Sequence, residues 1–172
     1  ILPDLPEYEF ETEYGAVIKK YNLDFIFLVT PETSEERIKK LDSLSTGFLY
    51  AVSSSSTTGG EKSTSASQEY LLQLKNLKLQ NPVLVGFGIK DKASFDAVCQ
   101  LADGAIIGSA YIKVLENSTN VNAATKNFLS SILHWRSFAF RFDCLNLYTG
   151  PVFPYRSWKL ILVKYEKIAF SF

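Results

Sequence analysis

The stretch Pro82-Val-Leu-Val-Gly-Phe-Gly-Ile89 is a compact apolar run that ends in the glycines Gly86 and Gly88, and Ala102-Asp-Gly-Ala-Ile-Ile-Gly-Ser-Ala110 repeats this pattern about one βα unit later. Backbone N–H groups at glycines, together with a helix N-terminus, can surround a phosphate closely. In (β/α)8 barrels the loops after strands seven and eight build such a cradle. The two stretches therefore predict that Gly86-Phe87-Gly88 and Gly108-Ser109 form a phosphate site at one rim of a parallel sheet.

Strand-like and helix-like segments alternate over residues 24–109. Strands that are apolar on both faces and separated by helices indicate a parallel sheet with covered faces. Thr33 and Glu36 form a capping-box pattern at the start of one helix. Upstream, residues 1–6 resemble the exit of an earlier strand, followed by an acidic helix to Tyr21. We expect strands at 25–29, 47–52, 82–87 and 104–107, and helices at 33–44, 67–77, 92–101 and 109–116.

This order predicts the α/β class and a partial (β/α)8 barrel, from the end of strand four through strand eight and the final helices. The chain has 172 residues and no methionine, whereas a closed barrel usually has at least about 200. We therefore expect a fragment, about the second half of a barrel.

With 47% hydrophobic residues, 21% charged residues and zero net charge, the composition is that of a globular protein and does not favour nucleic-acid or membrane binding. Cys99 and Cys144 lack metal-ligand spacing and are interpreted as reduced thiols of a cytoplasmic protein.

The segment 53–67 is rich in serine, threonine and glycine and has the composition of a flexible linker. It also follows the C-terminal end of an expected strand, where barrels of this kind place their active-site loops. We favour a lid over a linker.

The combination of motifs resembles the tryptophan synthase alpha subunit over residues 1–133. Pro3-Asp-Leu-Pro6, Leu23-Asp-Phe-Ile-Phe-Leu-Val-Thr-Pro31 and Gly47-Phe-Leu-Tyr-Ala-Val-Ser53 come in that family's order, together with the two glycine stretches. Tyr50, eight residues before Thr58-Gly59, is the most specific feature. The resemblance implies a lyase of tryptophan biosynthesis, which cleaves indole-3-glycerol phosphate to indole and glyceraldehyde 3-phosphate and passes indole to a beta subunit.

The resemblance also implies roles for individual residues. The catalytic glutamate and aspartate of the family belong to the first half of the barrel, so we expect no catalytic residue, no metal and no cofactor here, and a chain that is inactive alone. Thr58 matches the lid threonine. The phosphate-binding positions are Gly59, Gly88, Gly108 and Ser109; the walls for indole and glycerol are Leu28, Tyr50, Phe87 and Ile106; the positions near the beta-subunit contact are Asp4 and Pro6.

Several plainer interpretations stay open at this point. The glycines can merely end strands, Tyr50 and Phe87 can be core aromatics, and Asp4 can cap a helix. His134 has no partner at motif spacing, so we assign it no catalytic role. The alternative functions are a non-catalytic phosphate-binding half barrel that assembles with another chain, and a different phosphate-barrel isomerase or epimerase.

Residues 134–172 differ in composition from the rest and do not resemble the family. They hold 11 of the 24 aromatic residues, and six Lys/Arg against two Asp/Glu. The segment 159–165 is β-prone. An interaction surface and an anionic membrane contact are possible roles, but we favour an out-of-frame or misassembled extension, which is expected to lack a defined partner.

Overall fold

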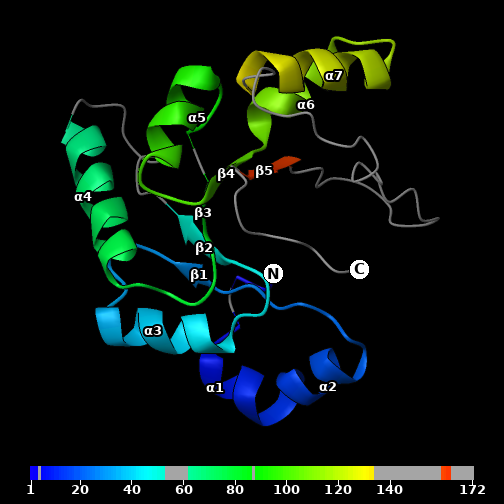
Figure 1. Ribbon diagram of the computed structural model, residues 1–172. Helices are drawn as coiled ribbons and strands as arrows, with labels where there is room; N and C mark the ends of the chain where they lie inside the picture. Colours follow the sequence, from blue (N-terminus) through cyan, green and yellow to red (C-terminus); the bar gives the residue numbers. More distant parts are fainter. Residues whose placement is uncertain (4, 53–61, 87, 134–159, 164–172) are drawn as a thin grey trace.

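The computed structural model describes residues 1–3, 5–52, 62–86, 88–133 and 160–163, with residues 62–66 and 160–163 described by their backbone alone. Helices and parallel strands alternate along the chain, as expected (Figure 1). No helix of this described part is long and apolar enough to cross a bilayer. The elements are α1 Glu7–Glu9, η1 Phe10–Tyr14, α2 Gly15–Lys20, β1 Leu28–Val29, α3 Glu35–Leu44, β2 Leu49–Val52, α4 Lys62–Asn76, β3 Val83–Gly86, α5 Lys92–Cys99, β4 Gly104–Ile107, α6 Ser109–Glu116, α7 Val121–Ile132 and β5 Leu160–Val163.

The sheet has the order β1-β2-β3-β4-β5. Its first four strands are parallel neighbours, with Leu28 opposite Tyr50, Tyr50 opposite Leu84, and Gly86 opposite Ile106. Consecutive parallel strands joined by helices form one arc of a (β/α)8 barrel. The predicted partial barrel is confirmed.

Side chains of the strands alternate between two apolar clusters, one on each face of the sheet. On one face Val29, Leu49, Val85 and Ile107 pack with the helices in a cluster that also contains apolar residues of α3 to α7. On the other face the described residues form a smaller cluster, whose members come from the β1 to β4 segments. Helices therefore cover one face, which corresponds to the outside of a barrel. The opposite face, which we call the inner face, has the buried residues Phe48, Tyr50, Leu84 and Ile106, with Ile26, Leu28 and Val52 packed against them.

The ends of several elements follow from local hydrogen bonds. Helix α3 is capped by Ser34, whose Oγ accepts from the Arg37 N–H at 3.4 Å. The predicted capping box of Thr33 and Glu36 is therefore wrong by one residue, because Thr33 Oγ1 instead accepts from the Thr30 N–H at 3.0 Å. Helix α4 begins earlier than predicted, whereas β4 and α6 have the predicted bounds.

The expected N-terminal helix is present as three consecutive helical segments, α1, η1 and α2, with a π-helical turn in the middle. Phe10 of that turn packs on Phe25 and Phe27, with ring centroids 4.6 and 5.1 Å away. Glu7 and Glu11 pair with Arg37 and Lys40 of α3, each at 2.9 Å. These contacts dock the acidic start of the helix beside α3.

The strand expected within residues 159–165 is present as β5, which pairs with β4 in the antiparallel sense. Leu160–Val163 therefore has a defined place in the sheet, as the neighbour of β4. The other residues of the segment 134–172, His134 among them, lie outside the described part of the chain.

Candidate functional site

The two glycine stretches lie at the same rim of the sheet, because β3 and β4 are parallel neighbours and the glycines follow their C-terminal ends. Gly88 has a φ of 76°, in the left-handed region that a glycine adopts without strain. Gly108 is the N-cap of α6 and makes no side-chain capping bond. Ser109, the first residue of α6, is exposed.

The start of α6 is the helix terminus that was expected to contact the phosphate. The first N–H groups of a helix have no partner within the helix and lie at the positive end of its dipole. In α6 the Ile112 N–H is bonded to the Gly108 carbonyl at 3.1 Å, so the helical hydrogen bonds begin there and the amides of the first turn precede them. Gly59, the third expected cradle position, lies outside the described residues, as do Thr58, Phe87 and Asp4.

Three of the four residues expected to wall the indole pocket lie together on the inner face. Leu28, Tyr50 and Ile106 belong to the same apolar cluster although they come from three different strands. Tyr50 and Ile106 are buried, with 4% and 5% of their surfaces exposed, and Leu28 is half-buried. The face they form is apolar and aromatic, which suits a flat indole ring.

Tyr50 makes a close approach to β3 that the sequence interpretation did not include. A Cβ at Gly86 would lie 2.5 Å from Tyr50 Cζ and 2.6 Å from Cε2, and it would also overlap the hydroxyl. Gly86 stands opposite Ile106 in the sheet, so the Tyr50 ring extends toward the rim beside Ile106. A glycine inside a strand is a known signal of such an approach. It is the signal by which this approach to Gly86 could have been predicted.

Burial also fixes the protonation state of this tyrosine. Desolvation raises the pKa of the Tyr50 hydroxyl above its usual range. The side chain is therefore neutral at physiological pH. The neutral hydroxyl therefore adds no charge to the apolar inner-face cluster.

Pro6, an expected beta-subunit contact, is exposed at the start of α1. Glu7, the next residue, bonds Arg37 in the first turn of α3, and α3 follows the C-terminal end of β1. A hydrogen bond from its own backbone N–H and the contact with Arg37 together lower the pKa of Glu7. Pro6 therefore lies at the same rim as Gly88 and Gly108.

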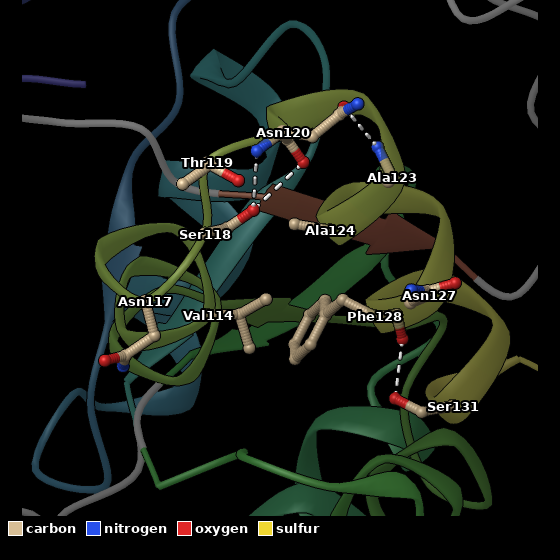
Figure 2. A pocket seen from close by; sticks show the side chains of 10 residues that line it. All are labelled: Val114, Asn117, Ser118, Thr119, Asn120, Ala123, Ala124, Asn127, Phe128 and Ser131. Carbon is tan, nitrogen blue, oxygen red and sulfur yellow. Dashed lines mark hydrogen bonds between the residues drawn. The ribbon is translucent and has the colours of Figure 1, made fainter.

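A groove of about 530 Å³ between α6 and α7 lies at the other end of α6 (Figure 2). Several of its polar groups are bonded within the hairpin: Ser118 Oγ donates to the Asn120 carbonyl and accepts from the Asn120 N–H, and Asn120 Oδ1 accepts from the Ala123 N–H at 3.0 Å. None of the expected site residues lines it. The groove is a feature of the helix hairpin and is separate from the rim.

Comparison with known proteins agrees with this geometry. A sequence profile described as tryptophan synthase alpha chain matches residues 1–135. The tryptophan synthase alpha chain of Flavobacterium johnsoniae is 50% identical over 119 residues, which are 69% of this chain and 47% of that protein. That of Bacteroides thetaiotaomicron is 41% identical over 125 residues, 72% of this chain and 49% of that protein. The chain therefore spans about half the length of these relatives.

Solved structures give the same result. Tryptophan synthase subunit alpha from Campylobacter jejuni superposes with a TM-score of 0.63 at 28% identity, covering 76% of this chain and 52% of that chain. Tryptophan synthase from M. tuberculosis in its aminoacrylate-bound form gives a TM-score of 0.59 at 30% identity, over 76% of this chain and 49% of the other. By its sequence profile, its relatives and its fold, this chain belongs to the tryptophan synthase alpha chain family, a family of lyases in tryptophan biosynthesis.

Proposed function

We propose that this chain forms the substrate-binding part of a tryptophan synthase alpha site, without the groups that carry out the cleavage. The observation that supports it is the position of the apolar inner face directly below the rim that carries Gly88, Gly108 and Ser109. Indole-3-glycerol phosphate has a flat apolar end and a dianionic end, and these two surfaces match its two ends.

In this proposal, phosphate binding is a task of the main chain. The first-turn amides of α6 and the amide of Gly88 donate to the phosphate oxygens, and Gly59 adds a third contact from the lid. The indole ring packs against Leu28, Tyr50, Phe87 and Ile106. Hydrogen bonds from fixed N–H groups to an anion are stronger than those between neutral groups, so the phosphate supplies much of the affinity.

The cleavage itself needs a group that exchanges a proton within hydrogen-bond distance of the reacting atoms. In the family that the sequence resembles, this task is expected of a glutamate and an aspartate in the first half of the barrel. We therefore propose that the chain binds the substrate without cleaving it. Release of indole then requires a complementary half, and transfer of indole requires a beta subunit that contacts the rim near Asp4 and Pro6. A cytoplasmic location is part of the same proposal.

A pair of charge variants tests the site. Ser109→Glu places a carboxylate at the first residue of α6, which suits the helix dipole but repels a phosphate. Val121→Glu makes the same change of charge at the first residue of α7, where Val121 is 58% exposed. It is the matched control because it adds a carboxylate to a helix N-terminus away from the rim.

Binding of indole-3-glycerol phosphate to the full chain is measured by calorimetry. We expect Ser109→Glu to weaken binding by about 10- to 100-fold, the equivalent of one charge-assisted hydrogen bond, and Val121→Glu to have little effect. Both variants are expected to be at least as stable as the parent chain. Equal affinities for the two variants, or no binding by the parent chain, would contradict the proposed site.

A second measurement separates this function from that of a non-catalytic half barrel. The N-terminal part of the Flavobacterium johnsoniae alpha chain that precedes the matched region is added, and indole release is measured. Recovery of indole release supports a role in the lyase reaction. A folded complex that binds the substrate but releases no indole favours the non-catalytic alternative.

A further inference from the structure

The edge of β4 is covered by a segment from the far end of the chain. Leu160–Val163 runs antiparallel to Gly104–Ile107, with Ala105 opposite Leu162 and Ile106 opposite Ile161 (Figure 1). Gly104, Ala105 and Ile106 are therefore paired with β3 on one side and with β5 on the other, and Ile107 is paired with β5. The sheet ends in β5 rather than in a parallel strand.

Without β5, β4 would be an exposed edge with little protection against another strand. Its four residues are apolar or glycine, and all four are buried. Natural sheets protect their edges with charged side chains, proline or bulges, and none of these occurs within Gly104-Ala-Ile-Ile107. Asp103, just before the strand, accepts the Val83 N–H at 2.8 Å and so belongs to the β3 side.

The opposite edge of the sheet has its own protection. The ladder of β1 has only two residues, and Pro31 follows shortly after it. A short strand that ends near a proline is a poor template for pairing. The β4 edge is therefore the edge that needs a cover.

We propose that β5 is an intramolecular edge cap, which prevents β4 from pairing with a strand of a second copy of this chain. The pairing uses main-chain groups and therefore does not depend on the exact side chains of the tail. Its antiparallel sense differs from the parallel sense that continues the sheet, so β5 closes the sheet rather than extending the barrel. The inference is independent of the proposed substrate.

The test is a pair of proline variants of the full chain. Ile161→Pro with Leu162→Pro removes two consecutive N–H groups. Since consecutive N–H groups of a strand point to opposite sides, one of the two is directed at β4. The control, Ala169→Pro with Phe170→Pro, introduces two prolines into the same tail outside β5.

Association is followed by sedimentation velocity at increasing concentration, and pairing by amide hydrogen exchange. We expect the parent chain and the control to stay monomeric, and the β5 variant to form dimers or larger species. In dilute solution the β4 amides that face away from β3 are expected to exchange about five- to tenfold faster in the β5 variant, the factor for losing one net hydrogen bond. A synthetic peptide of residues 158–165 is expected to return the variant to monomers.

Two results would overturn the edge cap. One is a β5 variant that stays monomeric and keeps the parent rate of exchange in β4. The other is a parent chain in which the amides of residues 160–163 exchange as fast as in the isolated peptide. The second measurement needs no variant, so it decides the question even if the proline variant fails to fold.

Discussion

The contact between Tyr50 and Gly86 gives a quantitative test of the inner face. Replacing Gly86 by alanine places a methyl group 2.5 Å from Tyr50 Cζ and 2.6 Å from Cε2, whereas ordinary carbon contacts begin near 3.4 Å. The overlap is therefore almost 1 Å, and the ring has to move within a buried cluster. Overpacking of this kind costs about 1–3 kcal/mol. With a urea m-value of about 1–3 kcal/mol/M, we expect the urea midpoint of Gly86→Ala to fall by roughly 1 M.

The cause is tested by a double-mutant cycle with Tyr50. Tyr50→Val alone is expected to cost about 3 kcal/mol because a buried ring is lost. Adding Gly86→Ala to it is expected to cost close to nothing, because the methyl group then occupies space that the ring has left. The double variant is therefore expected to be more stable, by about 1–3 kcal/mol, than the sum of the two single effects would give.

Two controls sharpen this cycle. Tyr50→Phe removes only the hydroxyl and leaves both clashing ring carbons, so it is not expected to rescue Gly86→Ala. Gly47→Ala is the matched glycine substitution, because the nearest atom to its new methyl group lies 3.8 Å away, at an ordinary contact distance. If Gly86→Ala is as mild as Gly47→Ala, or if its effect adds to that of Tyr50→Val, the close approach does not hold the ring in place.

Three further predictions concern residues away from the inner face. Asp42 is buried, and its carboxylate accepts hydrogen bonds from the Asn81 N–H and from Asn81 Nδ2, each at 3.0 Å. We expect Asp42→Ala to lower the free energy of urea unfolding by about 3 kcal/mol or more, and Asp42→Asn to lower it by less. The hydroxyl and N–H of Ser94 donate to the Asp91 carboxylate and lower its pKa. The stabilising contribution of Asp91 is therefore present above about pH 4 and is lost as the pH falls through the lowered pKa. Asp91→Asn is expected to remove this acid sensitivity of thermal unfolding. The buried Tyr70 hydroxyl has no hydrogen-bond partner among the described residues, so Tyr70→Phe is expected to leave the urea midpoint unchanged or to raise it.

Local chemistry made much of the fold predictable from the sequence. The bounds of β4 and α6 follow from Gly104 and Gly108, which mark the ends of a short apolar run. The cap of α3 was misplaced because Thr33 and Ser34 are adjacent residues of the same capping class. In the turn before the helix the Thr30 N–H donates to the Thr33 hydroxyl, which leaves Ser34 as the cap.

Features that depend on distant parts of the chain were harder to predict. A π-helical turn at Phe10–Tyr14 has no clear sequence signal, and it accompanies the packing of Phe10 against two phenylalanines of the β1 segment. The approach of Tyr50 to Gly86 joins two strands, so the sequence offered only a glycine inside a strand. The β-prone character of residues 159–165 was visible, but the choice of β4 as its partner was not, because strand propensity carries no information about register.

The proposed site and the proposed edge cap share the strand β4, and this links the two proposals. Ile106 belongs to the inner face and is paired with Ile161 of the tail, while Gly108 and Ser109 follow at the end of the same strand. A complementary half that continues the barrel from this side needs the β4 edge in the parallel sense, but β5 holds that edge in the antiparallel sense. One edge cannot pair with two strands, so β5 has to leave before such a half can dock. If both proposals hold, the Ile161→Pro and Leu162→Pro variant accepts the complementary half more readily than the parent chain, and its recovered release of indole is correspondingly larger.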